Sequence, residues 1–234
     1  MKAMILAAGL GTRLKPFTDH HPKALAPVNG KPVLQRNVEF LQQYGINEVI
    51  VNVHHFADQI LDAIEINSGW GSKITVSDER TEVLETGGGI LKASWFLKDS
   101  GSFVVMNADI LTDLDLGAMI TAHHENKPLG TLAVTSRSSS RALLFNTKNE
   151  LCGWKSEKTG ETKGKTGQPL AFSGIQIISP AIFNFMRFQG KFSMIDVYLD
   201  LCSEHQFLGF DHSQGIFIDI GTTEKLAIAE KVFP

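Results

Sequence analysis

Residues 3–13, AMILAAGLGTR, decide the fold class and the expected chemistry. The apolar run at residues 3–7 predicts a buried strand, and Gly9 and Gly11 directly after it predict a tight loop. Glycine lets a backbone turn sharply and approach a ligand closely, so successive N–H groups can converge on phosphate oxygens. Arg13 adds a forked cation that suits a polyphosphate.

Two further cations, Lys15 and Lys23, follow this loop closely. A glycine pair alone would fit a simple tight turn at a strand end equally well. The added positive charge favours a loop that binds a polyanion over a structural turn.

Outward from this loop, apolar runs alternate with amphipathic stretches. The runs predict strands at residues 48–53, 74–77 and 103–106, and the amphipathic spacing predicts helices at 33–44, 57–66, 89–97 and 116–124. Such alternation indicates right-handed βαβ crossovers and a mostly parallel sheet. We therefore expect an α/β fold of the Rossmann-like type, with three α/β/α layers around a mostly parallel central sheet.

The pattern changes after residue 130. Short strand candidates at 131–134, 142–146 and 150–154 predict hairpins, hence a small antiparallel subregion, and the polar stretch 155–169 predicts a mobile surface loop. Strands are then expected at 174–178, 207–210 and 216–220, and helices at 180–188, 194–205 and 223–232. Because no repeat or linker is evident, we expect a single domain over residues 1–234.

The composition excludes several classes of protein. The 234 residues are 43% hydrophobic and 20% charged with a net charge of −3, which excludes disorder, collagen and coiled coil. The slight negative charge gives no reason to expect nucleic acid or an anionic membrane as a partner. The two cysteines lack metal-ligand spacing, and no signal peptide or spanning segment is evident. We expect a cytoplasmic protein.

Two acidic residues end apolar runs far apart in the sequence. Asp109 follows the strand candidate 103–106, and Asp219 lies within the candidate 216–220. In open α/β sheets, ligands bind beyond the carboxyl ends of the strands. A lone aspartate there is more often a cap or turn residue, but two that converge can hold Mg²⁺ together with substrate phosphates. The sequence thus predicts a Mg²⁺ site at Asp109 and Asp219.

Two other nucleotide-binding motifs fit less well. The P-loop needs Gly-Lys-Ser/Thr at a helix start, and the chain has none at such a position. The dinucleotide fingerprint needs a third glycine near position 14 and an acid closing the second strand, where the chain has Leu14, Asn52 and His54. Hydride transfer is therefore disfavoured.

The segment 6–14, LAAGLGTRL, with Pro16, Thr18 and Pro22-Lys23 after it, resembles the signature of the sugar-1-phosphate nucleotidyltransferase family. Residues 107–109 and 219–222 resemble the same family, so the resemblance covers essentially the whole chain. Within the family, residues 84–90 and 172–174 are most similar to bacterial N-acetylmuramate-1-phosphate uridylyltransferases of cell-wall recycling. Some relatives also carry a left-handed β-helix domain, which we do not expect here.

The resemblance implies that a sugar-1-phosphate oxygen attacks the α-phosphorus of an NTP, giving an NDP-sugar and pyrophosphate with Mg²⁺ as cofactor. It implies catalytic roles for Arg13, Lys23 and Asp109. The nucleotide contacts it implies are Leu6, Ala7, Ala8, Gly9, Gly11, Thr12, Arg13, Lys23, Glu79, Thr86, Gly87 and Gly88. The sugar contacts it implies are Asn107, Lys155, Ser173 and Gly174, although a solvated loop explains any single lysine between residues 155 and 165 equally simply.

The substrates stay open at this point. UTP with N-acetylmuramate 1-phosphate is the favoured pair, and GTP with a mannose or heptose 1-phosphate is the first alternative. Glu79 stands where many relatives have a glutamine, and its carboxylate could accept hydrogen bonds from guanine or from uracil. A cytidylyltransferase for an alcohol phosphate, or a catalytically silent nucleotide-sugar sensor, are further alternatives. The sequence leaves monomer and homodimer equally open.

Overall fold

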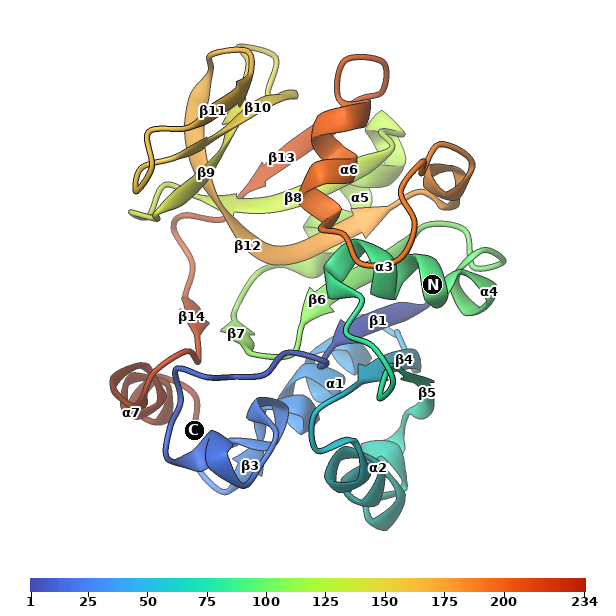
Figure 1. The fold of residues 1–234 in the computed structure, drawn as a ribbon, viewed down its shortest axis with the longest axis vertical. Helices are drawn as coiled ribbons and strands as arrows, with labels where there is room; N and C mark the ends of the chain where they lie inside the picture. Colours follow the sequence, from blue (N-terminus) through green and yellow to red (C-terminus); the bar gives the residue numbers. More distant parts are fainter.

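A mixed sheet of ten strands runs through the molecule in the computed structural model, which describes residues 1–234 (Figure 1). Four parallel strands form one half of it, in the order β6-β1-β4-β5. They are β1 (Ala3–Leu6), β4 (Glu48–Val53), β5 (Lys73–Asp78) and β6 (Phe103–Asn107). Their carboxyl ends carry the loop after residue 6 and the segment after residue 107, as the alternating pattern predicts.

The long strand β12 (Gln168–Ile178) connects this half to the antiparallel region. It pairs antiparallel with β6 and with β8 (Gly130–Thr135), while its first residues pair with β9 (Arg141–Phe145). The remaining strands are β10 (Leu151–Ser156), β11 (Thr162–Gly164) and β13 (Phe207–Asp211). In Figure 1, β9, β10 and β11 turn away from the central sheet, which confirms the predicted antiparallel subregion.

Helices cover both faces of the sheet, and the alternation of side chains along the strands shows this directly. Ile5 belongs to one buried cluster and its neighbour Met4 to another, since successive strand residues point to opposite faces. The first cluster holds α1 (Val33–Gln43), α2 (Ala57–Ile66) and α5 (Leu116–Asn126). The second holds α3 (Glu85–Lys92), α4 (Ser94–Leu97) and α6 (Met194–Leu201). The three-layer α/β/α prediction is confirmed.

Local sequence signals explain where the helices form. In α1, Leu34, Val38 and Leu41 recur at helical spacing and are fully buried. The last helix, α7 (Thr223–Val232), has the predicted bounds, and the hydroxyl of its N-cap Thr222 accepts a hydrogen bond from the backbone of Lys225. None of the helices is both long and apolar enough to cross a bilayer.

Four short 3-10 helices complete the helical elements: η1 (Phe17–Asp19), η2 (Lys23–Leu25), η3 (Ser68–Gly71) and η4 (Pro180–Asn184). Of the predicted helix at 180–188, only η4 forms. The residues that follow it belong to a turn and an irregular segment.

The predicted loop at 155–169 is wrong in part, because β11 lies within it and pairs with β10. All three residues of β11 are exposed, so this edge strand has no buried face and no apolar alternation to reveal it. Gly164 has a φ of +77°, and a Cβ there would stand 2.4 Å from the Cys152 carbonyl oxygen. The close approach of the two strands therefore requires glycine at this position.

The sequence also gave no sign of three short strands, β2 (Pro27–Val28), β3 (Lys31–Pro32) and β7 (Ile110–Thr112). The first two form a hairpin. The third pairs antiparallel with β14 (Phe217–Asp219), which lies apart from the main sheet next to α7 in Figure 1. This small ladder joins two segments about a hundred residues apart, at the carboxyl end of β6.

Candidate active site

The β7–β14 ladder brings the two predicted metal carboxylates together. Asp219 pairs with Ile110 in the ladder, and the Ile220 N–H donates to the Asp109 carbonyl oxygen at 2.8 Å. The buried Asn37 side chain of α1 fixes the same segment by donating to the Ala108 carbonyl oxygen at 3.0 Å. Asp109 and Asp219 therefore stand side by side through backbone contacts, before any side-chain charge acts.

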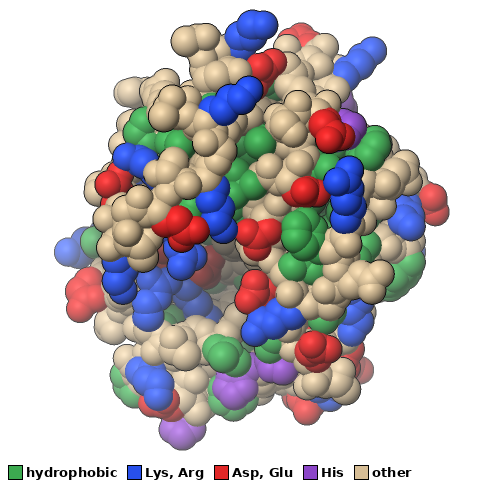
Figure 2. All heavy atoms as spheres, turned by 45° about the horizontal axis from the view of Figure 1, so that its top comes forward, with side chains coloured by type: hydrophobic (Ala, Val, Ile, Leu, Met, Phe, Trp, Pro, Cys, Tyr) green, Lys and Arg blue, Asp and Glu red, His purple; other side chains and the backbone are tan.

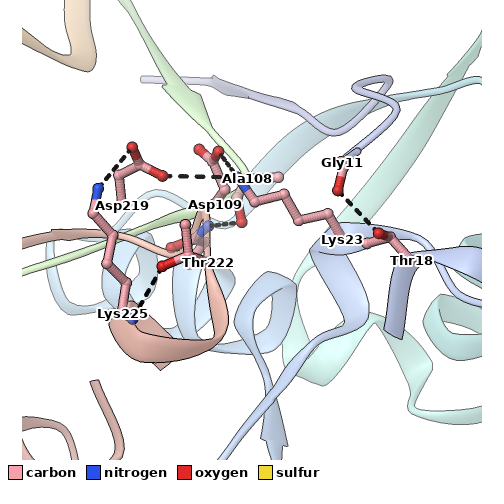
Figure 3. A network of polar contacts seen from close by, with 9 residues as sticks. Gly11, Thr18, Lys23, Ala108, Asp109, Asp219, Thr222 and Lys225 are labelled. Atoms are coloured by element: carbon pink, nitrogen blue, oxygen red, sulfur yellow. Dashed lines mark hydrogen bonds and ion pairs between the residues drawn. The ribbon is translucent and has the colours of Figure 1, made fainter. Parts of the chain in front are cut away.

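Lys23 reaches the space between these two carboxylates (Figure 3). Its ammonium donates to Asp109 Oδ2, and it lies 3.7 Å from Asp219 Oδ1. The loop after β1 supports this position, because Gly11 packs against the Lys23 stem. Gly11 has a φ of +62°, and a Cβ there would lie 2.9 Å from Lys23 Cβ, so the second loop glycine is needed for packing as well as for the turn.

Asp219 is surrounded by positive charge. Lys225 Nζ lies 3.2 Å from Asp219 Oδ2, and the Arg13 guanidinium packs against Gly221, where a Cβ would lie 3.4 Å from Nη2. Burial alone would raise the pKa of Asp219, but Lys23, Lys225 and Arg13 outweigh it and hold the pKa below its ordinary value. Sequence analysis missed Lys225. Its place in the first turn of α7, shortly after Asp219, was the only available signal.

A pocket of about 400 Å³ opens beside these residues at the carboxyl ends of the parallel strands. Its lining comes from the β1 loop, the ends of β4 and β6, and the start of α3: Leu6, Ala8, Gly9, Asn52, Val83, Glu85, Thr86, Asn107, Asp109 and Ser193. Figure 2 shows a hollow in the surface, with Lys and Arg side chains along one side and Asp and Glu side chains facing it. Several predicted nucleotide contacts thus share one cavity.

Asn52 forms part of the pocket lining and, like Val83, Glu85 and Ser193, was not among the predicted contacts. Its Oδ1 accepts from the Ala7 N–H at 2.7 Å, and its Nδ2 donates to Glu79 Oε1 at 2.9 Å. Glu79 itself is fully buried and does not line the pocket. Burial raises the pKa of the Glu79 carboxyl, and the hydrogen bond from Asn52 only partly opposes this. The expected direct contact between Glu79 and the base is therefore corrected: Asn52 faces the cavity and Glu79 holds Asn52.

The triple glycine has a packing function in this structure. Helix α3 begins at Glu85 rather than after the glycines, and the N–H groups of Gly87 and Gly88 both point to the Phe192 carbonyl oxygen, at 2.9 and 3.3 Å. A Cβ on Gly87 would lie 2.4 Å from the Phe192 ring. Neither glycine lines the pocket. Of the three nucleotide contacts expected in this segment, only Thr86 is part of the lining.

The predicted sugar contacts are only partly assembled. Asn107 lines the pocket, and Gly174, with a φ of +72°, lets β12 approach it: a Cβ would lie 2.5 Å from Asn107 Nδ2. Ser173 is buried, and its hydroxyl is hydrogen-bonded to His212 Nε2 at 2.8 Å. Lys155, on β10, pairs with the carboxylate of Glu157 just after that strand and is not part of the pocket lining. Asn107 is therefore in close contact with Gly174 at the cavity, whereas Ser173 and Lys155 do not line it.

The donor set at Asp109 and Asp219 fits a hard cation. Asp219 Oδ1 is buried and has no hydrogen-bond partner, although it faces the same space as the Asp109 carboxylate. No group of three or more His, Cys, Asp or Glu side chains in the chain could enclose a metal. Two carboxylates without further protein ligands suit an ion such as Mg²⁺, which keeps waters and binds substrate phosphates.

Comparison with known proteins shows the family of the chain. The model of the family described as nucleotidyl transferase matches residues 2–143. The chain is 32% identical to N-acetylmuramate alpha-1-phosphate uridylyltransferase of Neisseria meningitidis, over 98% of this chain and 97% of the relative, and 30% identical to the Caulobacter vibrioides enzyme of the same name, over 97% and 95%. The crystal structure of HddC from Yersinia pseudotuberculosis complexed with GMP-PN superposes with a TM-score of 0.80 at 28% identity, covering 100% of this chain and 99% of that one. The chain belongs to the nucleotidyl transferase family.

Proposed function

We propose that this protein transfers a nucleotidyl group from an NTP to a sugar 1-phosphate, releasing pyrophosphate, and that UTP and N-acetylmuramate 1-phosphate are its substrates. The observation that carries the proposal is the position of Lys23 between Asp109 and Asp219, beside a pocket at the carboxyl ends of the parallel strands. The two uridylyltransferase relatives, matched over nearly their whole length, support the substrate pair.

In this proposal the bonds exchange directly at phosphorus. A phosphate oxygen of the sugar 1-phosphate forms a bond to the α-phosphorus, the bond from that phosphorus to the bridging β-phosphate oxygen breaks, and pyrophosphate leaves with the electron pair. No general base is needed, because the attacking phosphate is already ionised. Catalysis then depends on positioning and on charge neutralisation.

Each charged residue has a defined task in this scheme. The N–H groups of the loop around Gly9 and Gly11, together with Arg13, hold the triphosphate. The Lys23 ammonium donates hydrogen bonds to the α-phosphate as the negative charge of that phosphate grows. Asp109 and Asp219 hold Mg²⁺, which when bound supplies further charge neutralisation at the phosphates.

The uncharged residues divide between the two substrates. Asn52 and Thr86 line the side of the pocket that we assign to the nucleoside, and Asn107, next to Gly174, lies towards β12, where we place the sugar. GTP with a hexose 1-phosphate is the second candidate. It is favoured by the full-length likeness to a protein crystallised with GMP-PN and by relatives named mannose-1-phosphate guanylyltransferases.

A pyrophosphate-release assay tests the proposal. The four NTPs are each combined with N-acetylmuramate 1-phosphate, mannose 1-phosphate and glucose 1-phosphate, with Mg²⁺ and again with excess EDTA. We expect the fastest Mg²⁺-dependent turnover with UTP and N-acetylmuramate 1-phosphate. Preference for GTP with mannose 1-phosphate would establish the second candidate instead, and silence in every combination would contradict both and favour a nucleotide-sugar sensor.

A further inference from the structure

Arg137, in the loop between β8 and β9, is held in place by two contacts that leave its charge unpaired. Its Nη2 donates to the Phe172 carbonyl oxygen at 2.8 Å, and its Cζ lies 4.6 Å from the centroid of the Phe217 ring. None of the ion pairs in the molecule includes Arg137. A guanidinium that is fixed but not neutralised is pre-organised to bind an oxyanion.

The two anchors place Arg137 between the acidic pair and the predicted sugar side. Phe217 and Asp219 are alternate residues of β14, so their side chains point to the same side of that strand. Phe172 directly precedes Ser173 and Gly174 in β12. Partial burial lowers the pKa of the Arg137 guanidinium and the Asp219 charge opposes this, which agrees with the closeness of the two side chains.

A buried polar pair lies behind the partly buried anchor Phe217. His212 packs against Phe217. The two ring centroids lie 6.1 Å apart in an edge-on arrangement. The same histidine is hydrogen-bonded through Nε2 to the buried Ser173 hydroxyl. Phe217 is therefore in contact with both Arg137 and a buried polar pair, so the guanidinium does not depend on ligand for its position.

The proposed chemistry requires a cation at this point. The attacking oxygen must reach the α-phosphorus, which the proposed function places beside Lys23, Asp109 and Asp219. The acceptor phosphate therefore lies close to Asp219 as well. Arg13 is also free of ion pairs near Asp219, but it extends from the nucleotide loop, whereas Arg137 extends from the β8–β12 side.

We infer that Arg137 binds the phosphate group of the sugar 1-phosphate, in place of Lys155, which the resemblance implied as a contact of this substrate. This inference rests on the proposed function. Neither side chain is part of the pocket lining, but Lys155 is neutralised by Glu157, whereas Arg137 is free of ion pairs and has a forked guanidinium with donors to spare. The carboxylate of N-acetylmuramate is a second oxyanion that an arginine could bind, and the experiment separates it from the phosphate.

Arg137→Met, Arg137→Lys and the control Lys155→Met test the inference by steady-state kinetics with each substrate varied in turn. In Arg137→Met we expect the KM for the acceptor to rise roughly 10- to 100-fold, since a charge-assisted hydrogen-bonding pair is lost, while the KM for UTP stays as in the wild type. Arg137→Lys should recover part of the loss, and Lys155→Met should behave as the wild type. Calorimetric UTP binding shows that each variant is folded.

Glucose 1-phosphate, which has no carboxylate, is then used as a competitor against N-acetylmuramate 1-phosphate. Its inhibition constant should rise by the same factor in Arg137→Met. An unchanged inhibition constant would assign Arg137 to the carboxylate and overturn the inference, as would an unchanged acceptor KM or a loss in Lys155→Met. A wild-type protein that turns over no substrate pair is a different result, because it overturns the proposed function itself.

Discussion

The two sides of the pocket are held together by different kinds of interaction. On one side, which we call the amide wall (Ala7, Asn52 and Glu79), Asn52 joins a backbone N–H to a buried carboxyl through two hydrogen bonds. Every member of the amide wall is buried. These hydrogen bonds join protein groups to one another and need no ligand to form.

On the other side, which we call the ion-pair wall (Lys23, Asp109, Asp219 and Lys225), charges alternate in sign across partly exposed side chains. When a divalent cation or a triphosphate binds, the balance of charges changes on the ion-pair wall and not on the amide wall. Under the proposed function, the amide wall fixes the shape of the site and the ion-pair wall performs the chemistry. Each wall therefore makes a separate prediction.

The largest expected effect is on the ion-pair wall. Lys23→Ala should lower kcat by about 10²–10³, or roughly 3–4 kcal/mol, because the variant loses a cation that acts on the charge of the transition state. Pyrophosphate release at saturating substrates measures it. The matched control is Lys15→Ala, which removes an exposed lysine of the same loop that pairs with Asp19. Near-wild-type turnover in Lys23→Ala would contradict the assignment of the chemistry to the ion-pair wall.

The amide wall should respond in stability as well as in binding. Asn52→Ala leaves the Ala7 N–H and the Glu79 carboxyl without their partner, and we expect the free energy of unfolding to fall by about 2–4 kcal/mol. Urea denaturation measures this, and the KM for UTP should rise as the pocket lining loosens. The exposed Asn67, changed to Ala, is the control. A stable Asn52→Ala protein with a changed kcat alone would reverse the assignment of the two walls.

Acid should weaken the hydrogen bonds of a buried, uncharged side chain elsewhere in the fold. The clearest case is His123. Its ring nitrogens contact the hydroxyls of Ser102 and Thr131 at 3.0 and 2.9 Å, and burial, followed by the nearby His124, lowers its pKa from 6.5 to about 4. Between these pH values the unfolded chain binds the proton and the folded chain does not. The stability that His123 contributes is therefore present above about pH 6.5 and is lost as the pH falls towards 4.

We expect this residue to account for roughly 2 kcal/mol of unfolding free energy lost between pH 7 and pH 5. Urea denaturation at the two pH values measures the loss. His123→Gln should flatten the dependence, while His124→Gln, at an exposed neighbouring position, should keep most of it, because burial is the larger cause of the lowered pKa of His123. Equal pH dependence in all three proteins would contradict the prediction.

The smallest expected effect concerns Lys225, at the outer end of the ion-pair wall. Its pair with Asp219 is partly exposed and is worth at most about 1 kcal/mol. Because Lys225→Met removes a positive charge next to the proposed cation site, the Mg²⁺ concentration for half-maximal activity should fall about two- to fivefold. Lys225→Arg keeps the charge and should need as much Mg²⁺ as the wild type. A higher Mg²⁺ requirement in Lys225→Met would show that the lysine orients Asp219 instead.

The sequence predicts the features that depend on interactions between neighbouring residues, and not those that depend on contacts between distant parts of the chain. The bounds of α2 and α7 match the predicted 57–66 and 223–232, because apolar spacing and a capping threonine are local signals. The parallel direction of β1, β4, β5 and β6 follows from the alternation of elements, and the acidic residues at strand ends could be anticipated on the same basis. These features need no knowledge of distant contacts.

Other features depend on partners far away in the chain. A three-residue strand such as β7 has too few positions to show a period, so its pairing with β14, which joins Asp109 to Asp219, could not be derived. The packing of Gly87 against Phe192 and the burial of Glu79 behind Asn52 likewise follow from the folded chain alone. Arg137 carries no motif, and its anchors Phe172 and Phe217 lie in two separate strands.

Whether Asp109 and Asp219 share one divalent cation is tested most directly by crystals grown with Mn²⁺ and a non-hydrolysable UTP analogue, using anomalous scattering to locate the metal. We predict a single Mn²⁺ with an oxygen of each carboxylate at about 2.0–2.4 Å, and the Lys23 ammonium moved from between the carboxylates to the α-phosphate. A nucleotide-bound structure in which Mn²⁺ contacts only one of these carboxylates, or neither, would contradict the account.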